Sequence, residues 1–311
     1  MVDLSIIIPA KNEGKSILPL YLEISKELAK ITKSYEILFI DDGSTDNTFQ
    51  ELEKLHKENP KVKVIKLRGW FGKSIALQTG FEYATGEIII TMDADLQDDP
   101  KEIPNFLKKM NEGYDLVSGW KKIRHDPFSK TFPSKIGNVV TRLLTGIKIH
   151  DLNCGFKAYR KELTQNLHLY GELYKYIPVI AEKQNYKVGE IVVSHRSRKY
   201  GKSKFGWQRN IKGFLDMLTV VFLTGYLKRP AHFFGTLGII SFLLGFIIGL
   251  YISYLRITTG SIQYRQPLLF LGILLMIVGI QLITTGLLAE MLVNFNQSSG
   301  LKGNYIKEKV G

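Results

Sequence analysis

The sequence predicts an α/β domain built on a parallel sheet, followed by two transmembrane α-helices. Three observations carry this prediction. In the first half of the chain, short apolar runs alternate with stretches of helical periodicity, as in sheets covered by helices on both faces. Near the C-terminus, two runs of more than 20 residues contain no Asp, Glu, Lys or Arg. The single Cys among 311 residues excludes a disulfide framework and a thiolate zinc cluster.

The strands and helices of the first half can be assigned in chain order. The apolar runs have the length and composition of buried parallel strands, and turn-forming residues or Asn-Pro separate them from the helical stretches. The expected strands are 4–8, 35–40, 62–67 and 87–92, and the expected helices cover 15–30, a stretch ending near 59, and 73–84.

Polar clusters follow three of these strands at the point where each strand ends. They are Lys11-Asn12-Glu13, Asp41-Asp42 and Asp93-Ala94-Asp95. Ligands of open parallel sheets bind beyond the carboxyl ends of the strands, so a binding site is expected at this edge. No GxGxxG follows the first strand and no GxxxxGK[ST] is present, which disfavours the usual dinucleotide and P-loop sites.

The segment after strand 87–92 is the candidate metal site. Alternate residues of an extended segment project the same way, so Asp93, Asp95 and Gln97 can converge on one point. Carboxylate and amide oxygens suit Mg²⁺ or Mn²⁺, either of which can bridge a diphosphate. A solvated acidic turn is the alternative interpretation. The position of the segment at the end of the strongest apolar strand favours the metal.

The two charge-free runs, 231–255 and 266–289, are each long enough to cross about 30 Å of hydrocarbon as a helix. Both are apolar all round, which argues against a core helix of a soluble protein. The short linker places both chain ends on one side of the membrane, and the flanking lysines and arginines place that side in the cytoplasm. The first 13 residues lack the features of a signal peptide, which agrees with a cytoplasmic first half.

The net charge of +13 predicts anionic partners. Residues 196–229 hold nine Lys/Arg against one acid, next to the expected spans. A nucleic-acid partner is disfavoured because aromatic stacking residues are not interleaved with these charges, while a general clamp on anionic lipid stays open. Residues 207–227 have the pattern of an interfacial amphipathic helix. Trp70 and Phe71 are expected to serve packing, and Cys154 to fill a small buried space.

Six segments carry a family resemblance. Four of them, SIIIPAKNE, EILFIDDGSTDNT, FGKSIALQTG and GEIIITMDADLQDDP, resemble in order the signature of family 2 glycosyltransferases with the GT-A fold. With CGFKAYRKE, RKYGKSKF and the two spans, the chain resembles the polyprenyl-phosphate glycosyltransferases, a group that includes dolichol-phosphate mannose synthase and undecaprenyl-phosphate sugar transferases. The resemblance extends over nearly the whole chain. It implies transfer of a sugar from a UDP- or GDP-sugar to undecaprenyl or dolichyl phosphate at the cytoplasmic membrane face, giving a lipid-linked donor for cell-envelope or protein glycosylation.

The resemblance also implies roles for individual residues. The implied donor-binding residues are Pro9, Lys11, Glu13, Asp41, Asp42, Asp93, Ala94, Asp95 and Lys121. The implied ligands of Mg²⁺ or Mn²⁺ are Asp95 and Gln97, and the implied acceptor-phosphate residues are Lys130, Ser134, Arg198, Ser203 and Lys204. The residues expected to matter most for catalysis are Asp93, Asp95, Lys130 and Arg198. Lys121 and Lys130 stand where relatives more often carry arginine, and lysine lacks the bidentate fork of a guanidinium.

The expected reaction needs no catalytic base, because a phosphomonoester is largely dianionic at neutral pH and is itself a nucleophile. Direct displacement would invert the anomeric carbon. Two alternatives stay open: a processive polysaccharide synthase, although Gln208-Arg209-Asn210 does not match QxxRW, and a non-enzymatic nucleotide-sugar-binding membrane protein.

The expected organisation follows from these patterns, and a homo-oligomer through the transmembrane helices is left open. The expected parts are a cytoplasmic GT-A domain at 1–205, an interfacial helix at 206–229, spans at 231–255 and 267–293 joined by an extracytoplasmic linker at 256–266, and a cytoplasmic tail at 294–311.

Overall fold

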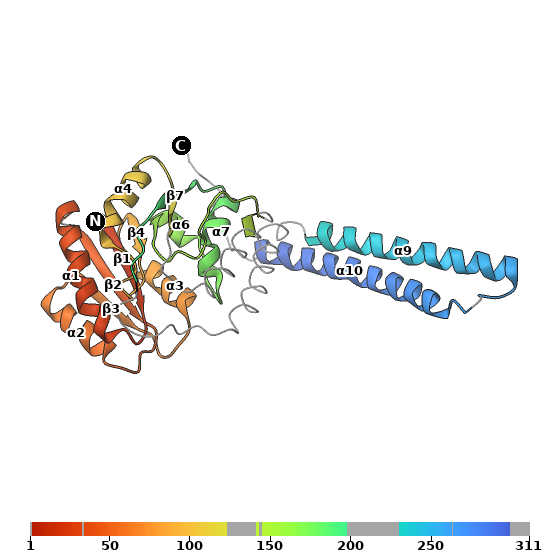
Figure 1. Ribbon diagram of the computed structural model, residues 1–311, viewed down its shortest axis with the longest axis horizontal. Coiled ribbons are helices and arrows are strands. Elements are labelled where there is room, and N and C mark those ends of the chain that lie inside the picture. The colour runs from red at the N-terminus through yellow and green to blue at the C-terminus, as the bar shows by residue number, and fades with distance from the viewer. Residues whose placement is uncertain are drawn as a thin grey trace. The chain divides into compact units, whose positions relative to one another are not determined.

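The protein is described here by a computed structural model. It describes residues 2–32, 34–122, 141–142, 145–197, 230–262 and 264–298. The chain divides into two compact units, Met1–Thr224 and Gly225–Gly311. Figure 1 shows the elements of each unit. The expected interfacial helix lies outside the described residues, as do Lys130, Ser134, Arg198, Ser203 and Lys204.

The first unit is built on a seven-stranded sheet with the order β3-β2-β1-β4-β6-β5-β7. Strands β1 to β4 are parallel, as the sequence predicts. Strand β6 is antiparallel to both of its neighbours, so β5 and β7 again run with β1 to β4. The strands are β1 (Leu4–Ala10), β2 (Tyr35–Asp41), β3 (Val62–Lys66), β4 (Ile88–Thr91), β5 (Leu116–Trp120), β6 (Lys157–Arg160) and β7 (Val188–Val192).

Helices cover both faces of the sheet, and each face has its own core (Figure 1). Successive side chains of a strand point to opposite faces, so Ile6 and Ile8 of β1 join one core while Ile7 joins the other. Helices α1, α2 and α4 contribute to the first core, and α3, α6 and α7 to the second. The helical elements are α1 (Gly14–Ile31), α2 (Thr48–Glu58), α3 (Lys73–Tyr83), η1 (Pro100–Glu102), α4 (Ile103–Asn111), α6 (Lys161–Gln165), η2 (Leu173–Tyr176) and α7 (Ile177–Lys183).

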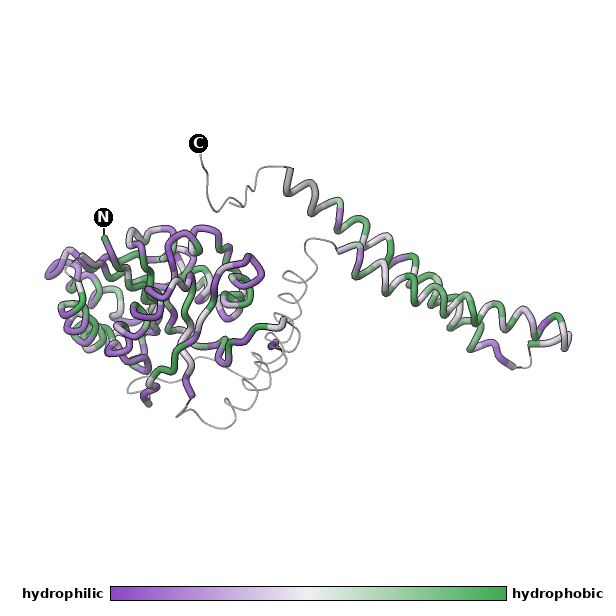
Figure 2. The backbone as a smooth tube through the Cα atoms, turned by 90° about the horizontal axis from the view of Figure 1, so that it is seen from above, coloured by the Kyte–Doolittle hydropathy of each residue, from purple (hydrophilic) through white to green (hydrophobic). Residues whose placement is uncertain are grey.

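The second unit is a pair of long apolar helices, α9 (Pro230–Thr259) and α10 (Gln266–Ser298). Figure 2 shows that both are predominantly hydrophobic along their length. Both helices are long and apolar enough to cross a membrane, and most of their side chains face outward. Their backbones approach closely at glycines: a Cβ added to Gly238 would lie 2.6 Å from the carbonyl oxygen of Gly279. The two predicted spans are therefore confirmed as candidate membrane helices.

Candidate functional site

The loops after β1 and β2 are bonded to each other at the carboxyl edge of the sheet. The Asn12 side-chain oxygen accepts a hydrogen bond from the Thr45 N–H at 2.7 Å, and the Glu13 N–H donates to the Thr48 hydroxyl at 2.8 Å. Lys11 Nζ donates to the carbonyl oxygen of Asp42 at 3.3 Å. The donor-site candidates of the first two polar clusters are therefore brought together.

Asp41 and Asp42 are both buried, but their carboxylates have different surroundings. Asp42 accepts the N–H groups of Phe71 and Gly72 at 2.8 and 2.9 Å and so fixes the loop that leads into α3. Burial raises the pKa of Asp42 even though these two bonds act in the other direction. Asp41 Oδ1 accepts the Ser44 N–H at 3.0 Å, whereas its Oδ2 is buried without a hydrogen-bond partner among the described residues.

The loop fixed by Asp42 carries two exposed aromatic side chains. Trp70 is 73% exposed and Phe71 is 58% exposed, so the expectation that they serve packing is wrong. Asp42 holds this loop through the backbone N–H groups of Phe71 and Gly72 rather than through the two rings. Lys11 Nζ lies 4.6 Å from the centre of the Trp70 ring, in a cation–π arrangement.

Two lysine–aspartate pairs lie at the third polar cluster, and one of them includes Asp93 of that cluster. Lys73, in the first turn of α3, pairs with the carboxylate of Asp93, and Lys121 Nζ lies 2.8 Å from Asp98 Oδ1. Burial by itself would raise the pKa of Asp93, but Lys73 and Lys121 outweigh it and lower this pKa to about 2. Burial alone would lower the pKa of Lys121, but the negative charge of Asp98 outweighs burial, so the pKa of Lys121 is raised. The pairs keep Asp93, Lys73 and Lys121 charged at neutral pH.

The strand β6 brings its N-terminal end beside the carboxyl end of β4, because the two strands are antiparallel and Thr91 is in register with Lys157. The Thr91 hydroxyl donates to the carbonyl oxygen of Gly155 at 2.7 Å. Gly155 faces the charged pair so closely that an added Cβ would lie 2.6 Å from Asp93 Oδ2.

Lys157, the first residue of β6, is buried close to Gly155. Its ammonium donates to the carbonyl oxygens of Leu152, at 3.2 Å, and of Cys154. Burial lowers the pKa of Lys157 to about 8. Cys154 is a free, buried thiol, as the sequence predicts.

Sequence reasoning placed Lys73, next to Gly72, among the residues able to approach the donor, and the structure places it beside Asp93. It gave no role to Lys157, although Lys157 stands inside the CGFKAYRKE segment.

The candidate metal segment is not the extended segment that the sequence predicts, because the backbone turns at residues 94–95. Leu96 has φ +62°, a left-handed conformation that is costly for a large side chain, and it places Asp95 and Gln97 on either side of a tight turn. Asp95 Oδ1 accepts the Gln97 N–H at 3.2 Å. The Gln97 side-chain nitrogen lies 3.3 Å from the carbonyl oxygen of Arg196 and 3.4 Å from His195 Nε2.

The chemistry of this segment fits a hard cation with few protein ligands. No cluster of three or more His, Cys, Asp or Glu side chains that could hold a metal was found in the described part of the chain. Asp95 and Gln97 are both partly exposed and offer one carboxylate and one amide. Mg²⁺ commonly binds to one or two carboxylates and completes its shell with water and substrate phosphates.

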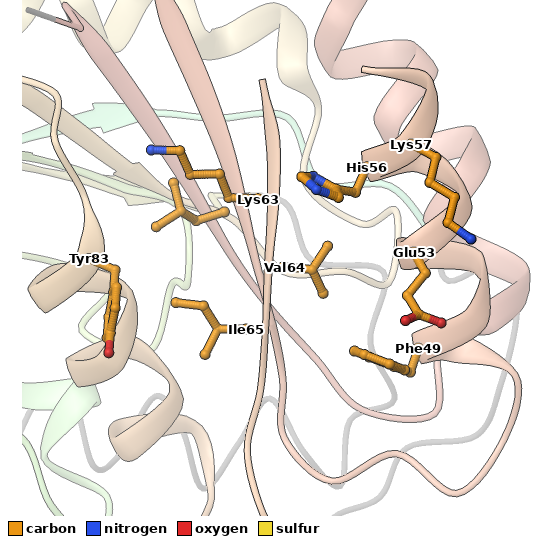
Figure 3. Close-up of a pocket in the computed structure, with 9 residues that line it drawn as sticks. Phe49, Glu53, His56, Lys57, Lys63, Val64, Ile65 and Tyr83 are labelled. Carbon is orange, nitrogen blue, oxygen red and sulfur yellow. The ribbon is translucent and has the colours of Figure 1, made fainter. Parts of the chain in front are cut away.

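A cavity of about 490 Å³ in the first unit lies elsewhere. It lies along the edge strand β3, between side chains of α2 and Tyr83 of α3 (Figure 3). None of the predicted site residues lines it, so it is separate from the candidate site.

Comparison with known proteins gives a consistent result. Residues 5–167 match the family described as Glycosyl transferase family 2. The chain is 35% identical to a dodecaprenyl-phosphate galacturonate synthase of Rhizobium johnstonii, over 99% of this chain and 93% of the relative. It is 32% identical to an undecaprenyl-phosphate 4-deoxy-4-formamido-L-arabinose transferase of Klebsiella pneumoniae, over 98% of this chain and 93% of the relative.

Among solved structures, glucosyl-3-phosphoglycerate synthase from Mycobacterium tuberculosis, in complex with Mn²⁺, UDP and phosphoglyceric acid, matches with a TM-score of 0.56 at 17% identity. The match covers 72% of this chain and 78% of that one. At this identity the likeness shows the fold, and it confirms the predicted α/β architecture of the GT-A type.

Proposed function

Because this chain belongs to glycosyl transferase family 2 and is a glycosyltransferase, we propose that it transfers a sugar from a UDP- or GDP-sugar to a polyprenyl phosphate at the cytoplasmic face of a membrane. The observation that carries the proposal is the extent of the similarity. Two relatives whose names specify a polyprenyl phosphate match this chain over at least 98% of its length, including both apolar helices. A processive synthase is disfavoured because the described residues hold two candidate spans and the chain lacks QxxRW.

In this proposal, Asp95 and Gln97 hold the divalent cation, either Mg²⁺ or Mn²⁺. When bound, the cation neutralises the diphosphate of the donor and stabilises it as a leaving group. The nucleoside is assigned to the end of β1 and the loop after it, which carry Pro9, Lys11 and Glu13. Of the two neighbouring acids, Asp41 has a carboxylate oxygen without a hydrogen-bond partner among the described residues, whereas both oxygens of Asp42 bond the loop before α3.

The chain's own charged groups prepare the diphosphate subsite. Asp93 and Asp98 keep Lys73 and Lys121 protonated and fixed in place before any donor arrives. Prepositioned charges of this kind need no reorganisation during the reaction, which is the usual source of electrostatic catalysis. Asp93 is therefore assigned a positioning role toward Lys73 in addition to its place beside the donor.

The acceptor phosphate is assigned to Lys130, Ser134, Arg198, Ser203 and Lys204, a set of cationic and hydroxyl side chains that lies outside the described residues. A phosphate dianion attacks the anomeric carbon directly, so no side chain has to remove a proton. The catalytic task is to hold two anions together at reacting distance. A single displacement gives a product with an inverted anomeric centre.

The experiment is a transfer assay with the full chain in membranes, a panel of radiolabelled UDP- and GDP-sugars, and polyprenyl phosphates as acceptors. Asp95→Asn removes a charge with little change of volume and should abolish transfer. Asp115→Asn is the matched control: its carboxylate accepts the Lys187 N–H at 2.8 Å at the opposite edge of the sheet, and an asparagine can keep that bond. Full turnover in excess EDTA, or in Asp95→Asn, would refute the metal assignment. A wild-type protein that transfers no sugar to any polyprenyl phosphate would refute the acceptor.

A further inference from the structure

The segment after β7 is fixed by an arginine that no part of the proposed reaction uses. Arg196 lies four residues beyond β7, and its guanidinium bridges two carboxylates from different elements. One Nη lies 2.5 Å from Glu23 of α1 and the other lies 2.6 Å from Asp99, the residue that caps η1. The side chains of Arg196, Asp99 and Glu23 are 26%, 14% and 35% exposed, so the bridge is partly buried. Such a two-pronged, partly buried bridge fixes geometry in a way that a solvent-exposed ion pair does not.

The backbone of Arg196 makes hydrogen bonds with both the backbone and the side chain of Gln97. The Arg196 N–H donates to the carbonyl oxygen of Gln97 at 2.9 Å, and the carbonyl oxygen of Arg196 accepts from the Gln97 side-chain nitrogen at 3.3 Å. The backbone and the side-chain amide of Gln97 therefore depend on one neighbouring residue. That neighbour is itself held through Glu23 and Asp99.

These contacts also select the orientation of the Gln97 amide. A terminal amide can rotate by about 180° and exchange its nitrogen and oxygen. With the nitrogen bonded to the Arg196 carbonyl, the amide oxygen is held in one of its two possible positions. The rotated amide would place its oxygen against the carbonyl oxygen of Arg196 and lose the bond to it. A hard cation requires the oxygen.

We propose that Arg196 is a positioning residue for the cation site: by bridging Glu23 and Asp99 it fixes the backbone that holds the Gln97 peptide and side-chain amide in one orientation. This inference rests on the proposed function only in taking Asp95 and Gln97 as the cation ligands. The bridge ties α1 and the cap of η1 to the metal segment, so the geometry of the site is set by residues that never touch donor or acceptor.

The test measures Mn²⁺ binding directly, by electron paramagnetic resonance of the full chain in detergent, with UDP and in parallel with GDP. Arg196→Met removes both ion pairs and keeps much of the side-chain volume. We expect Mn²⁺ to bind about tenfold more weakly, the size of effect seen when residues that orient metal ligands are replaced. Arg196→Lys can reach one carboxylate only and should show an intermediate affinity. Binding of the nucleotide in EDTA should not change.

Two further variants separate positioning from a loss of stability. The double variant Glu23→Gln, Asp99→Asn leaves Arg196 in place, removes both partner charges and keeps a side chain that can cap η1, so it serves if Arg196→Met does not fold. It should weaken Mn²⁺ binding as Arg196→Met does. Lys63→Met is the matched control: it removes an ion pair of the same length, 2.5 Å to the buried Glu36, away from the site. It should lower the melting temperature and leave Mn²⁺ affinity unchanged.

Each outcome separates the positioning role from the proposed function. Equal Mn²⁺ affinity in wild type, Arg196→Met and the double variant would overturn the role of Arg196 while leaving the transfer activity untouched. Weaker Mn²⁺ binding in these variants, together with a wild type that transfers no sugar, would support the positioning role of Arg196 and refute the assignment of a polyprenyl phosphate as acceptor. A Lys63→Met protein that also loses Mn²⁺ affinity would show that the effect is general destabilisation. A wild type that binds no Mn²⁺ would overturn the role of Arg196 while leaving the proposed sugar transfer to its own assay.

Discussion

Gly155→Ala is the substitution with the sharpest structural expectation, because one added methyl group would enter the space of the Lys73–Asp93 pair. The new Cβ would lie 2.6 and 2.8 Å from the two Asp93 carboxylate oxygens and 2.8 Å from Lys73 Nζ. Ordinary contact begins at 3.4 Å, so the nearest oxygen would have to move by about 0.8 Å, the difference between 3.4 and 2.6 Å. The φ angle of Gly155 is not in the left-handed range, so space alone decides the effect.

Two terms contribute to the expected loss of stability. Overpacking of a tightly packed position costs about 1–3 kcal/mol. Widening a charge pair from about 3 to about 4 Å costs on the order of 1 kcal/mol at an effective dielectric constant near 20. The sum is about 2–4 kcal/mol, which for a unit of this size lowers the melting temperature by about 4–16 °C. Displacement of Asp93 and Lys73 should also weaken binding of the nucleotide-sugar donor.

The assay is thermal unfolding of the detergent-solubilised chain together with calorimetric titration of the nucleoside diphosphate. Gly69→Ala is the control, because a Cβ at Gly69 would meet nothing within 4 Å. In an Asp93→Ala background the carboxylate is gone, and the cost of Gly155→Ala should fall to about 1 kcal/mol or less. A cost that is the same in both backgrounds, or a Gly155→Ala protein with unchanged stability and nucleotide affinity, would refute the proposed close approach.

Three further predictions address stability, topology and the acceptor. Burial alone would raise the pKa of Glu36, but hydrogen bonds from Lys63, Ser5 and Thr85 outweigh burial and lower this pKa below 4.5. The ionised carboxylate therefore stabilises the fold fully above pH 4.5, and this stabilisation is lost on acidification. In urea unfolding, Glu36→Gln should be less stable than wild type at about pH 7 and approach wild type at about pH 4. In a Cys154→Ser, Ser261→Cys protein, an impermeant thiol reagent should label only from the extracytoplasmic side. Arg198→Ala should lower turnover about a hundredfold without changing donor affinity, and Arg198→Lys should recover part of it.

The results that would contradict these predictions are equally definite. A stability difference for Glu36→Gln that is the same at pH 4 and pH 7 would show that its carboxylate is not the stabilising species. Labelling of residue 261 only from the cytoplasmic side would refute the assigned topology. If Arg198→Ala loses donor affinity and keeps the acceptor Michaelis constant, Arg198 belongs to the donor subsite and not to the acceptor subsite.

The sequence by itself determined the first four strands, the helices between them and the two apolar helices. Each of these features leaves a local signature, either an apolar run of strand length or a charge-free run of membrane length. The parallel order of β1 to β4 then places their polar ends at one edge, so the sequence alone predicts that Lys11, Asp41 and Asp93 belong to one site.

Only the tertiary structure decided how the rest of the site is built. The antiparallel insertion of β6 between β4 and β5 brings Gly155 and Lys157 to Asp93, and pairing between strands more than 60 residues apart has no local pattern to reveal it. The same holds for the bridge from Arg196 to Glu23, two residues separated by 173 positions. Hydrophobic periodicity specifies which segments are buried, whereas the partners of a buried charge are set by which segments pack together, and that is a property of the whole fold.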